Sequence, residues 1–134
     1  MAKIGEIEGI GPVFREKLEK AGVLTTEILL EKGAAQAGRA ALAASTEIEE
    51  KRIMTFVSRA DFMRIKGVGR QFSELLQNVD IHTVDQLAAA SADDVNATMT
   101  KVNDVKHLTK VVPSVKQIQG FIDIAKGLDA VVSV

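Results

Sequence analysis

The stretch IKGVGRQFSELL, residues 65–76, places a valine between two glycines and continues at once with apolar residues at helical spacing. Two glycines around one hydrophobic residue favour a tight turn, because glycine adopts positive φ angles without steric cost. Such a turn either holds an anion at the start of the following helix or forms only the corner between two packed helices. The function predicted for the protein depends on which of these is correct.

The same pattern occurs once more, 58 residues earlier in the chain. Residues 7–29, IEGIGPVFREKLEKAGVLTTEIL, align without a gap with residues 65–87, IKGVGRQFSELLQNVDIHTVDQL. After a shift of seven more residues, TFVSRADF (residues 55–62) resembles GFIDIAKG (residues 120–127). The chain therefore consists of two versions of one unit. The positions that coincide include Gly9 with Gly67, Gly11 with Gly69, Phe14 with Phe72, Leu18 with Leu76 and Thr25 with Thr83.

Composition and charge restrict the class of protein. A chain of 134 residues with 46% hydrophobic and 26% charged residues is typical of one compact soluble domain, or of two small ones. Cysteine is absent, no apolar run is long enough to span a bilayer, and the N-terminus lacks the apolar core of a signal peptide, so we expect a cytoplasmic protein without a membrane partner. The net charge of -1 argues against nucleic-acid binding by the whole surface and leaves only a local basic patch.

Helix start and stop signals occur throughout the first unit. Pro12 suits the first turn of a helix, and Gly22 suits the left-handed residue after its end. A second short helix is predicted from Thr25 or Thr26 to Gly33. A third is predicted to start at Thr46, because TEIE places a glutamate three residues after a threonine. Its buried stripe is expected to be Ile48, Ile53, Phe56, Val57 and Ala60.

The second unit carries equivalent start signals, and its apolar residues lie at helical rather than alternating spacing. No segment has the pattern of a strand, so the predicted fold is all-α, with units at residues 1–60 and 61–134 that share a core. The predicted helix starts are Thr83 with Gln86, Ser91 with Asp94, and Ser114 with Gln117.

The motif Ile-x-Gly-hydrophobic-Gly between apolar helices resembles the helix-hairpin-helix motif. Its two tandem copies, with the linking segments GRAALA (residues 38–43) and FVSRADFMRIKGVG (residues 56–69), are similar to an uncharacterised domain-of-unknown-function family of tandem helix-hairpin-helix proteins. The resemblance covers almost the whole chain. It implies the architecture, whereas the family carries no established activity.

Relatives with this motif hold a DNA phosphate on backbone amides without reading bases, and the resemblance extends this role to the second hairpin. Two further arginines, Arg59 and Arg64, are placed on the preceding helix and make this the most basic short stretch of the chain. The candidate nucleic-acid-binding residues are Arg64, Lys66, Gly67, Val68, Gly69 and Arg70.

The first hairpin is expected to be structural. Pro12 removes an amide donor, and Glu6 and Glu8 would repel a phosphate. The motif usually has a small residue six positions after its first glycine, where this chain has Arg15 and Ser73. Arg15 is expected to contact a phosphate, lie outside the core or pair with a nearby glutamate.

Other chemistry is not indicated. The hairpins lack the preceding strand and third glycine of a dinucleotide-binding site, and no nucleophile–base set can be nominated, so we expect no enzyme, no cofactor and no metal. His82 and His107 are predicted to be surface or capping residues, and Asp93 with Asp94 a solvated first helical turn.

Two further groups bear on the partner. The phenylalanines are predicted to face the core, which disfavours base stacking; these are Phe14, Phe56, Phe62, Phe72 and Phe121. Four lysines either extend a basic track from the second hairpin or form an ordinary soluble face; these are Lys101, Lys106, Lys110 and Lys116.

Three hypotheses for function stay open: weak, sequence-independent binding of duplex DNA, a protein-interaction or scaffold module, and a purely structural role. The apolar segment Val131–Val134 lacks a helix signal and is expected to pack on a neighbour or to be disordered. The oligomeric state does not follow from the sequence.

Overall fold

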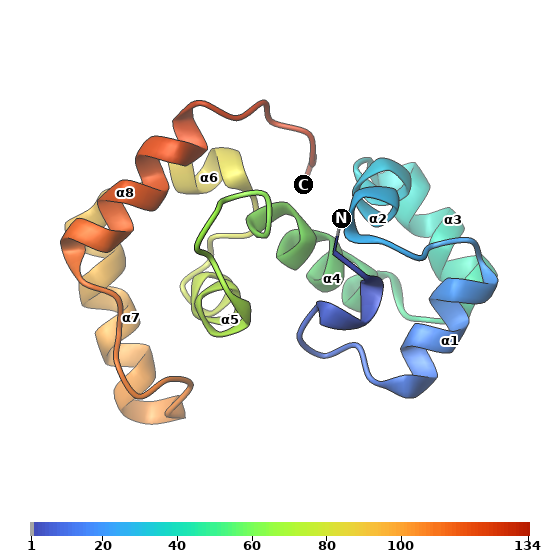
Figure 1. Cartoon of the computed structure of the whole chain (residues 1–134), viewed down its shortest axis with the longest axis horizontal. Helices are drawn as coiled ribbons and strands as arrows, with labels where there is room; N and C mark the ends of the chain where they lie inside the picture. The colour runs from blue at the N-terminus through green and yellow to red at the C-terminus, as the bar shows by residue number, and fades with distance from the viewer. Residues whose placement is uncertain (1) are drawn as a thin grey trace. The chain divides into compact units, whose positions relative to one another are not determined.

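The computed structural model describes residues 2–134, and within them the chain is all-α, which confirms the predicted fold class. Eight α-helices and a short 3-10 helix, η1, are present, and the described part holds no strand beyond an isolated bridge between Lys3 and Thr25 (Figure 1). No helix of residues 2–134 has the length and apolarity required to cross a membrane. The elements are η1 (Ile4–Glu6), α1 (Pro12–Lys20), α2 (Thr26–Gly33), α3 (Gln36–Thr46), α4 (Glu50–Phe62), α5 (Arg70–Asn78), α6 (Val84–Ala88), α7 (Ala92–Lys106) and α8 (Val115–Lys126).

The chain divides into two compact units. Unit 1 comprises residues 1–61 together with Val131–Val134, and unit 2 comprises Phe62–Ala130. The segment Val131–Val134, called here the closing segment, therefore belongs to the first unit although it follows the second in the sequence. A core shared by the two units stays a prediction.

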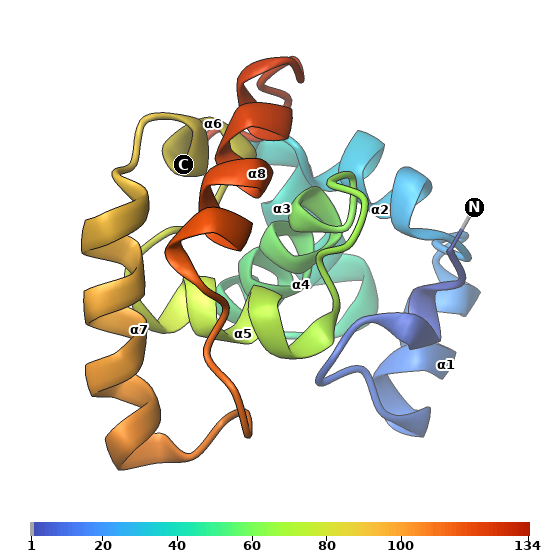
Figure 2. The same cartoon turned by 60° about the vertical axis from the view of Figure 1, so that its left-hand side comes forward.

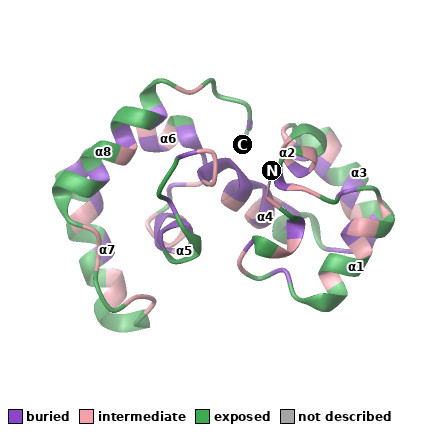
Figure 3. Ribbon diagram, in the orientation of Figure 1, coloured by how far each residue is buried: buried purple, intermediate pink, exposed green. Residues whose placement is uncertain are grey.

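In unit 1 the apolar face of α4 is buried (Figure 3). All five residues of the predicted stripe are buried, although Ile48 lies before α4 begins. Helix α1 contacts η1 and α3, and α2 contacts α3. Phe14 was expected in the core, but it is only half-buried and its ring lies edge-on to Phe56, with 5.7 Å between centroids. Val13, the neighbouring residue on α1, is 65% exposed.

The predicted helix start at Thr46 is wrong, because Thr46 is the last residue of α3. Its hydroxyl donates to the carbonyl of Leu42 at 2.6 Å and accepts from the amide of Ile48 at 3.3 Å. Glu47 follows with a φ of 60°, which ends α3 in the left-handed conformation. Helix α4 then begins at Glu50.

Unit 2 has a core made from its own residues. Helices α6 and α7 both pack on α8, and α5 packs on α7 (Figures 1 and 2). Leu76 is buried, and so is Phe72, as predicted. Phe121 was expected in the core but is half-buried, with its ring 4.8 Å from that of Phe72. The buried residues of this core are Phe62, Ile65, Val68, Phe72, Leu75, Leu76, Ile81, Val84, Leu87, Ala92, Val95, Met99, Ile118, Ile122 and Ala125.

The 58-residue repeat is preserved in the backbone hydrogen bonds. Helices α1 and α5 both span nine residues and start at equivalent positions. The helix after each of them is capped by a threonine at the same place in the repeat, as the sequence predicts. The equivalent bonds include Val23 N to Leu18 O (2.9 Å) with Ile81 N to Leu76 O (3.0 Å), and Ile28 N to Thr25 Oγ1 (3.2 Å) with Gln86 N to Thr83 Oγ1 (3.3 Å).

Candidate nucleic-acid interface

Val68 is the structural residue of the second hairpin. Its side chain is buried, and its amide donates to the carbonyl of Ile65 at 3.1 Å. Ile10 has the same role in the first hairpin, with its amide 3.2 Å from the carbonyl of Ile7. Although Val68 was a candidate for binding, its amide is already used within the turn, so any anion must be held by other groups.

The first glycine of each hairpin is required by the fold itself. Gly67 has a φ of 95° and Gly9 a φ of 91°, a conformation that side-chain-bearing residues rarely adopt. A Cβ atom on Gly67 would also lie 3.3 Å from Cε1 of Phe121, and one on Gly9 would lie 3.4 Å from Cε1 of Phe56. The positive φ and the close packing therefore account for glycine at these two positions without any bound ligand.

The second glycine of each hairpin is different. Gly69 precedes α5 with a φ of −96° and a ψ of −172°, which is extended backbone that any residue adopts. A Cβ atom added to it would meet nothing within 4 Å, and the same holds for Gly11 before α1. Neither backbone conformation nor internal packing requires a glycine at these two positions.

Helix α5 also begins without a side-chain cap. Serine or threonine hydroxyls accept hydrogen bonds at the starts of α6, α7 and α8, whereas Gly69 offers no side chain to α5. The first bond within α5 runs from the amide of Ser73 to the carbonyl of Gly69 at 3.1 Å. The amides of Gln71 and Phe72 precede it, and a helix supplies no acceptor of its own to the amides of its first turn. The start of α5 can thus accept an external anion.

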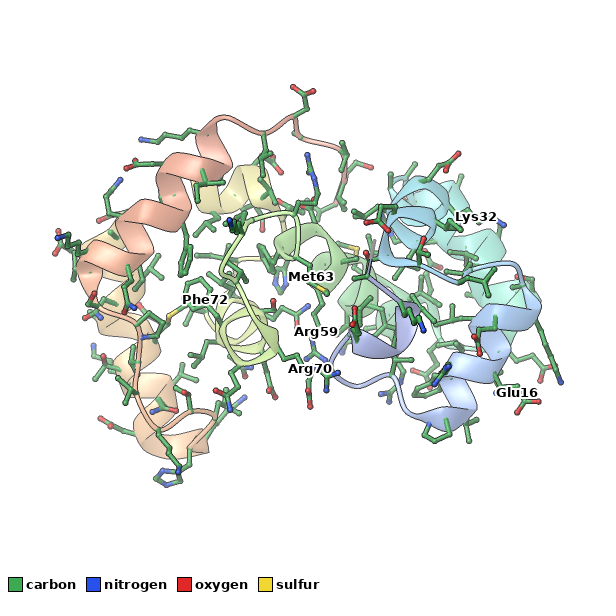
Figure 4. The ribbon with its side chains drawn as sticks, in the orientation of Figure 1. Glu16, Lys32, Arg59, Met63, Arg70 and Phe72 are labelled. Carbon is green, nitrogen blue, oxygen red and sulfur yellow. The ribbon has the colours of Figure 1, made fainter. Side chains whose placement is uncertain are left out.

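The three charged candidates, Arg64, Lys66 and Arg70, differ in their exposure to solvent. Lys66 and Arg70 are exposed, and Figure 4 shows the Arg70 and Phe72 side chains leaving the first turn of α5 in different directions. Arg64 does not lie on the preceding helix, because α4 ends at Phe62. It is half-buried, and its Nη2 donates to the carbonyl of Asp129 at 2.9 Å, so it braces unit 2 instead of projecting beside Lys66.

Arg59, the other arginine expected to support the second hairpin, instead forms a hydrogen bond to the first hairpin. Its Nη1 donates to the backbone carbonyl of Glu8, and a Cβ atom on Gly9 would lie 2.9 Å from the same nitrogen. The position that matches Arg59 in the weaker repeat of α4 and α8 is Ile124, which is exposed. The arginine that braces the first hairpin therefore has no arginine at the matching position beside the second.

A pocket of about 500 Å³ opens beside the start of α5. Its second wall is the loop between α7 and α8, which is fixed to α5 by a hydrogen bond of 3.3 Å between Thr109 Oγ1 and Gln71 Oε1. Asn103 steadies this loop through two bonds of 3.0 Å to the backbone of Thr109. The lining residues are Gly69, Arg70, Gln71, Phe72, Leu75, Thr109, Val111 and Pro113.

Of the four lysines expected to extend the basic track, one is next in sequence to residues that line this pocket. Lys110 is exposed and stands between two lining residues, Thr109 and Val111. Lys106 instead donates to Asn78 Oδ1 at 2.5 Å, near the other end of α5. Lys101 and Lys116 are exposed on α7 and α8.

The pocket at the first hairpin is less suited to an anion, because its lining includes Pro12, Glu16 and Glu19. Pro12 is the first residue of α1, as predicted, so one amide is lost. Arg15, one of the residues at the position where the motif is usually small, forms an ion pair of 3.4 Å with Glu19. Its counterpart Ser73 is buried and donates to the carbonyl of Gly69 at 3.0 Å. The pocket here, about 360 Å³, is lined by Gly5, Ile10, Gly11, Pro12, Arg15, Glu16 and Glu19.

Comparison with known proteins gives a family but no activity. The model of a domain of unknown function, DUF4332, matches residues 8–128. The chain belongs to this family. Searches of curated proteins and of solved structures find no match. The DUF4332 match contains both hairpins and stops before the closing segment.

The remaining candidate residues of this DUF4332 chain do not gather into a site. His107 is the exposed, left-handed residue that ends α7, and His82 is half-buried ahead of α6. Asp93 and Asp94 are exposed in the first turn of α7, as predicted. Among residues 2–134, no three histidine or acidic side chains are arranged to hold a metal ion.

Proposed function

We propose that the protein binds the sugar–phosphate backbone of duplex DNA through the second hairpin, without reading base sequence, and that both units are built on helix-hairpin-helix motifs. The observation that carries the proposal is Gly69. Its backbone needs no glycine and its Cβ position faces open space, which leaves room for an outside group to approach the backbone. Gly11 leaves the same room, but it is followed by Pro12, which has no amide hydrogen, where the second hairpin has Arg70.

A phosphate fits the chemistry at this position. The uncapped first turn of α5 presents amide donors and the positive end of the helix dipole. Lys66, Arg70 and Lys110 add positive charge on the surrounding surface. Contacts of this type fix the position of a protein on a duplex but carry no sequence information.

The binding is expected to be weak and sensitive to salt, because one hairpin neutralises few phosphates and the chain has a net charge of -1. For about two phosphate contacts, raising the salt from about 50 to about 200 mM should lower the affinity roughly tenfold. The first hairpin makes no contribution, since Pro12 and Glu16 reduce its donors and its positive potential.

The proposal is tested by fluorescence anisotropy of a labelled duplex at low salt. The double variant Lys66→Glu/Arg70→Glu should lose binding, because it places two negative charges beside the phosphate. A control with the same change of net charge, Lys51→Glu/Lys126→Glu, alters exposed lysines on α4 and α8 and should bind nearly as the wild type does. Changing Glu8 to lysine should strengthen binding slightly or leave it unaltered.

Two results would overturn the proposal. One is wild-type protein that shows no binding at high micromolar concentration. The other is a Lys66→Glu/Arg70→Glu variant that binds as well as the control. In either case both hairpins are structural corners, and the protein-interaction module becomes the better hypothesis.

A further inference from the structure

Arg39 is the buried cation of unit 1. Arg39 is only 4% exposed. Burying a charged group costs free energy unless hydrogen bonds satisfy its donors. Nη1 donates to the carbonyls of Gly33 and Ala34, both at 2.9 Å, and Nη2 donates to the carbonyl of Ser133 at 2.8 Å. All three acceptors are backbone carbonyls, two of them at the end of α2 and one in the closing segment.

The part of this site formed by α2 and α3 is built without the closing segment. Carbonyls at a helix C-terminus attract a cation, so Gly33 and Ala34 hold the guanidinium in place through Nη1. The stem of Arg39 lies in a packed region, because a Cβ atom on Gly33 would meet Val57, Arg39 and Leu42 within 4 Å. Nη2 and the carbonyl of Ala34 therefore form a donor and an acceptor that are positioned in advance.

The closing segment satisfies both groups. The amide of Ser133 donates to the carbonyl of Ala34 at 2.9 Å, while the carbonyl of Ser133 accepts from Arg39. Val132, one residue earlier, is buried, whereas Val131 and Val134 are 43% and 77% exposed. The segment has no regular secondary structure. It is held by one buried valine and by the backbone amide and carbonyl of Ser133, and the Ser133 hydroxyl lies 3.3 Å from the carbonyl of Ala34.

We propose that Arg39 and the end of α2 form a peptide-docking site, and that the closing segment is a ligand that detaches and rebinds as one piece. A segment held by few buried contacts opens at a small cost in free energy compared with the core. The site recognises an apolar residue followed by a residue whose backbone amide and carbonyl both form hydrogen bonds. The closing segment should therefore bind also when it is supplied as a separate peptide. This inference does not rest on DNA binding.

The test uses a chain shortened to residues 1–130 and a peptide of residues 127–134, GLDAVVSV, labelled at its N-terminus. Fluorescence anisotropy should show saturable binding of the peptide. A peptide with Ser133→Pro lacks the amide that reaches Ala34 and should bind at least about tenfold more weakly. A peptide with Ser133→Ala loses only the hydroxyl, which lies 3.3 Å from the same carbonyl, and should bind nearly as tightly as the natural sequence.

The proposal is wrong if the folded, shortened chain does not bind the peptide, or if the Ser133→Pro peptide binds equally well. If the shortened chain is unfolded, the helical circular dichroism signal should return on adding the natural peptide and not on adding the Ser133→Pro peptide. The full-length chain gives an independent measurement. There Ser133→Pro should lower the melting temperature and Ser133→Ala should not, and equal melting of the two variants would contradict the proposal.

Discussion

Gly38, in the first turn of α3, lies against the backbone of α2. A Cβ atom on Gly38 would lie 2.0 Å from the backbone carbonyl oxygen of Lys32, which cannot move without shifting α2. We expect Gly38→Ala to destabilise the protein by about 2 kcal/mol or more, as overpacking does. Urea unfolding followed by circular dichroism measures this, and a loss below about 0.5 kcal/mol would contradict the close approach.

Gly120 provides the matched comparison, because it lies inside α8 and a Cβ atom there would meet nothing within 4 Å. Alanine is the better helix former, so Gly120→Ala should stabilise the protein by about 0.5–1 kcal/mol. The same unfolding experiment measures it. A destabilised Gly120→Ala protein would show that this face of α8 is covered in solution.

At the residue scale the sequence predicts most of the core but misplaces two aromatic rings. The aromatic rings form two pairs, Phe14 with Phe56 and Phe72 with Phe121. In each pair one ring is buried, that of Phe56 or Phe72, and the other is half-buried. Helical spacing gives the side of the helix on which a ring lies. It does not give the depth, which depends on how α4 and α8 approach the hairpins.

At the element scale the helix starts set by local bonds are predicted well. Thr25, Thr83, Ser91 and Ser114 cap the helices at which the sequence places them, because capping needs only residues within one turn. Thr46 carries the same signal but bonds back to Leu42 at the end of α3. Two local structures compete for its hydroxyl, and the sequence alone does not show which one prevails.

The caps themselves should differ in strength. Thr83 is 1% exposed and accepts from the amide of Gln86, so Thr83→Ala should cost about 1–2 kcal/mol, whereas Thr83→Ser keeps the hydroxyl and should cost less. Ser91 is exposed and its bond to the amide of Asp94 is 3.5 Å long, so Ser91→Ala should cost only about 0.5 kcal/mol. Chemical unfolding of the three variants gives the order. Equal losses for Thr83→Ala and Ser91→Ala would show that burial does not strengthen the cap.

At the scale of the whole molecule, the core of unit 2 lies entirely within residues 62–125. A fragment of residues 62–130 should therefore melt cooperatively without unit 1, because domains of about this length can bury enough apolar surface to fold alone. Circular dichroism during heating measures this. A broad, non-cooperative transition would favour the shared core predicted from the sequence.

The candidate site is only partly predictable from sequence. The repeat and the basic residues Lys66 and Arg70 can be recognised in the sequence. The hydrogen bond from Arg64 to the carbonyl of Asp129 cannot, because it joins residues 65 positions apart. The Arg39 site is hidden for the same reason, since Ser133 is 94 positions away. Contacts over such distances follow from the packing of whole units, which no local pattern encodes.

Comparing Gly69→Ala with Gly11→Ala tests whether a phosphate lies against the second hairpin. Both changes add one methyl group in open space before a nine-residue helix, so each should cost about the same small amount of stability, about 1 kcal/mol or less. If an outside phosphate lies against the second hairpin, Gly69→Ala should weaken binding of a labelled duplex at least tenfold in fluorescence anisotropy, while Gly11→Ala should bind as the wild type does. Equal binding by the two variants would contradict a phosphate site at Gly69.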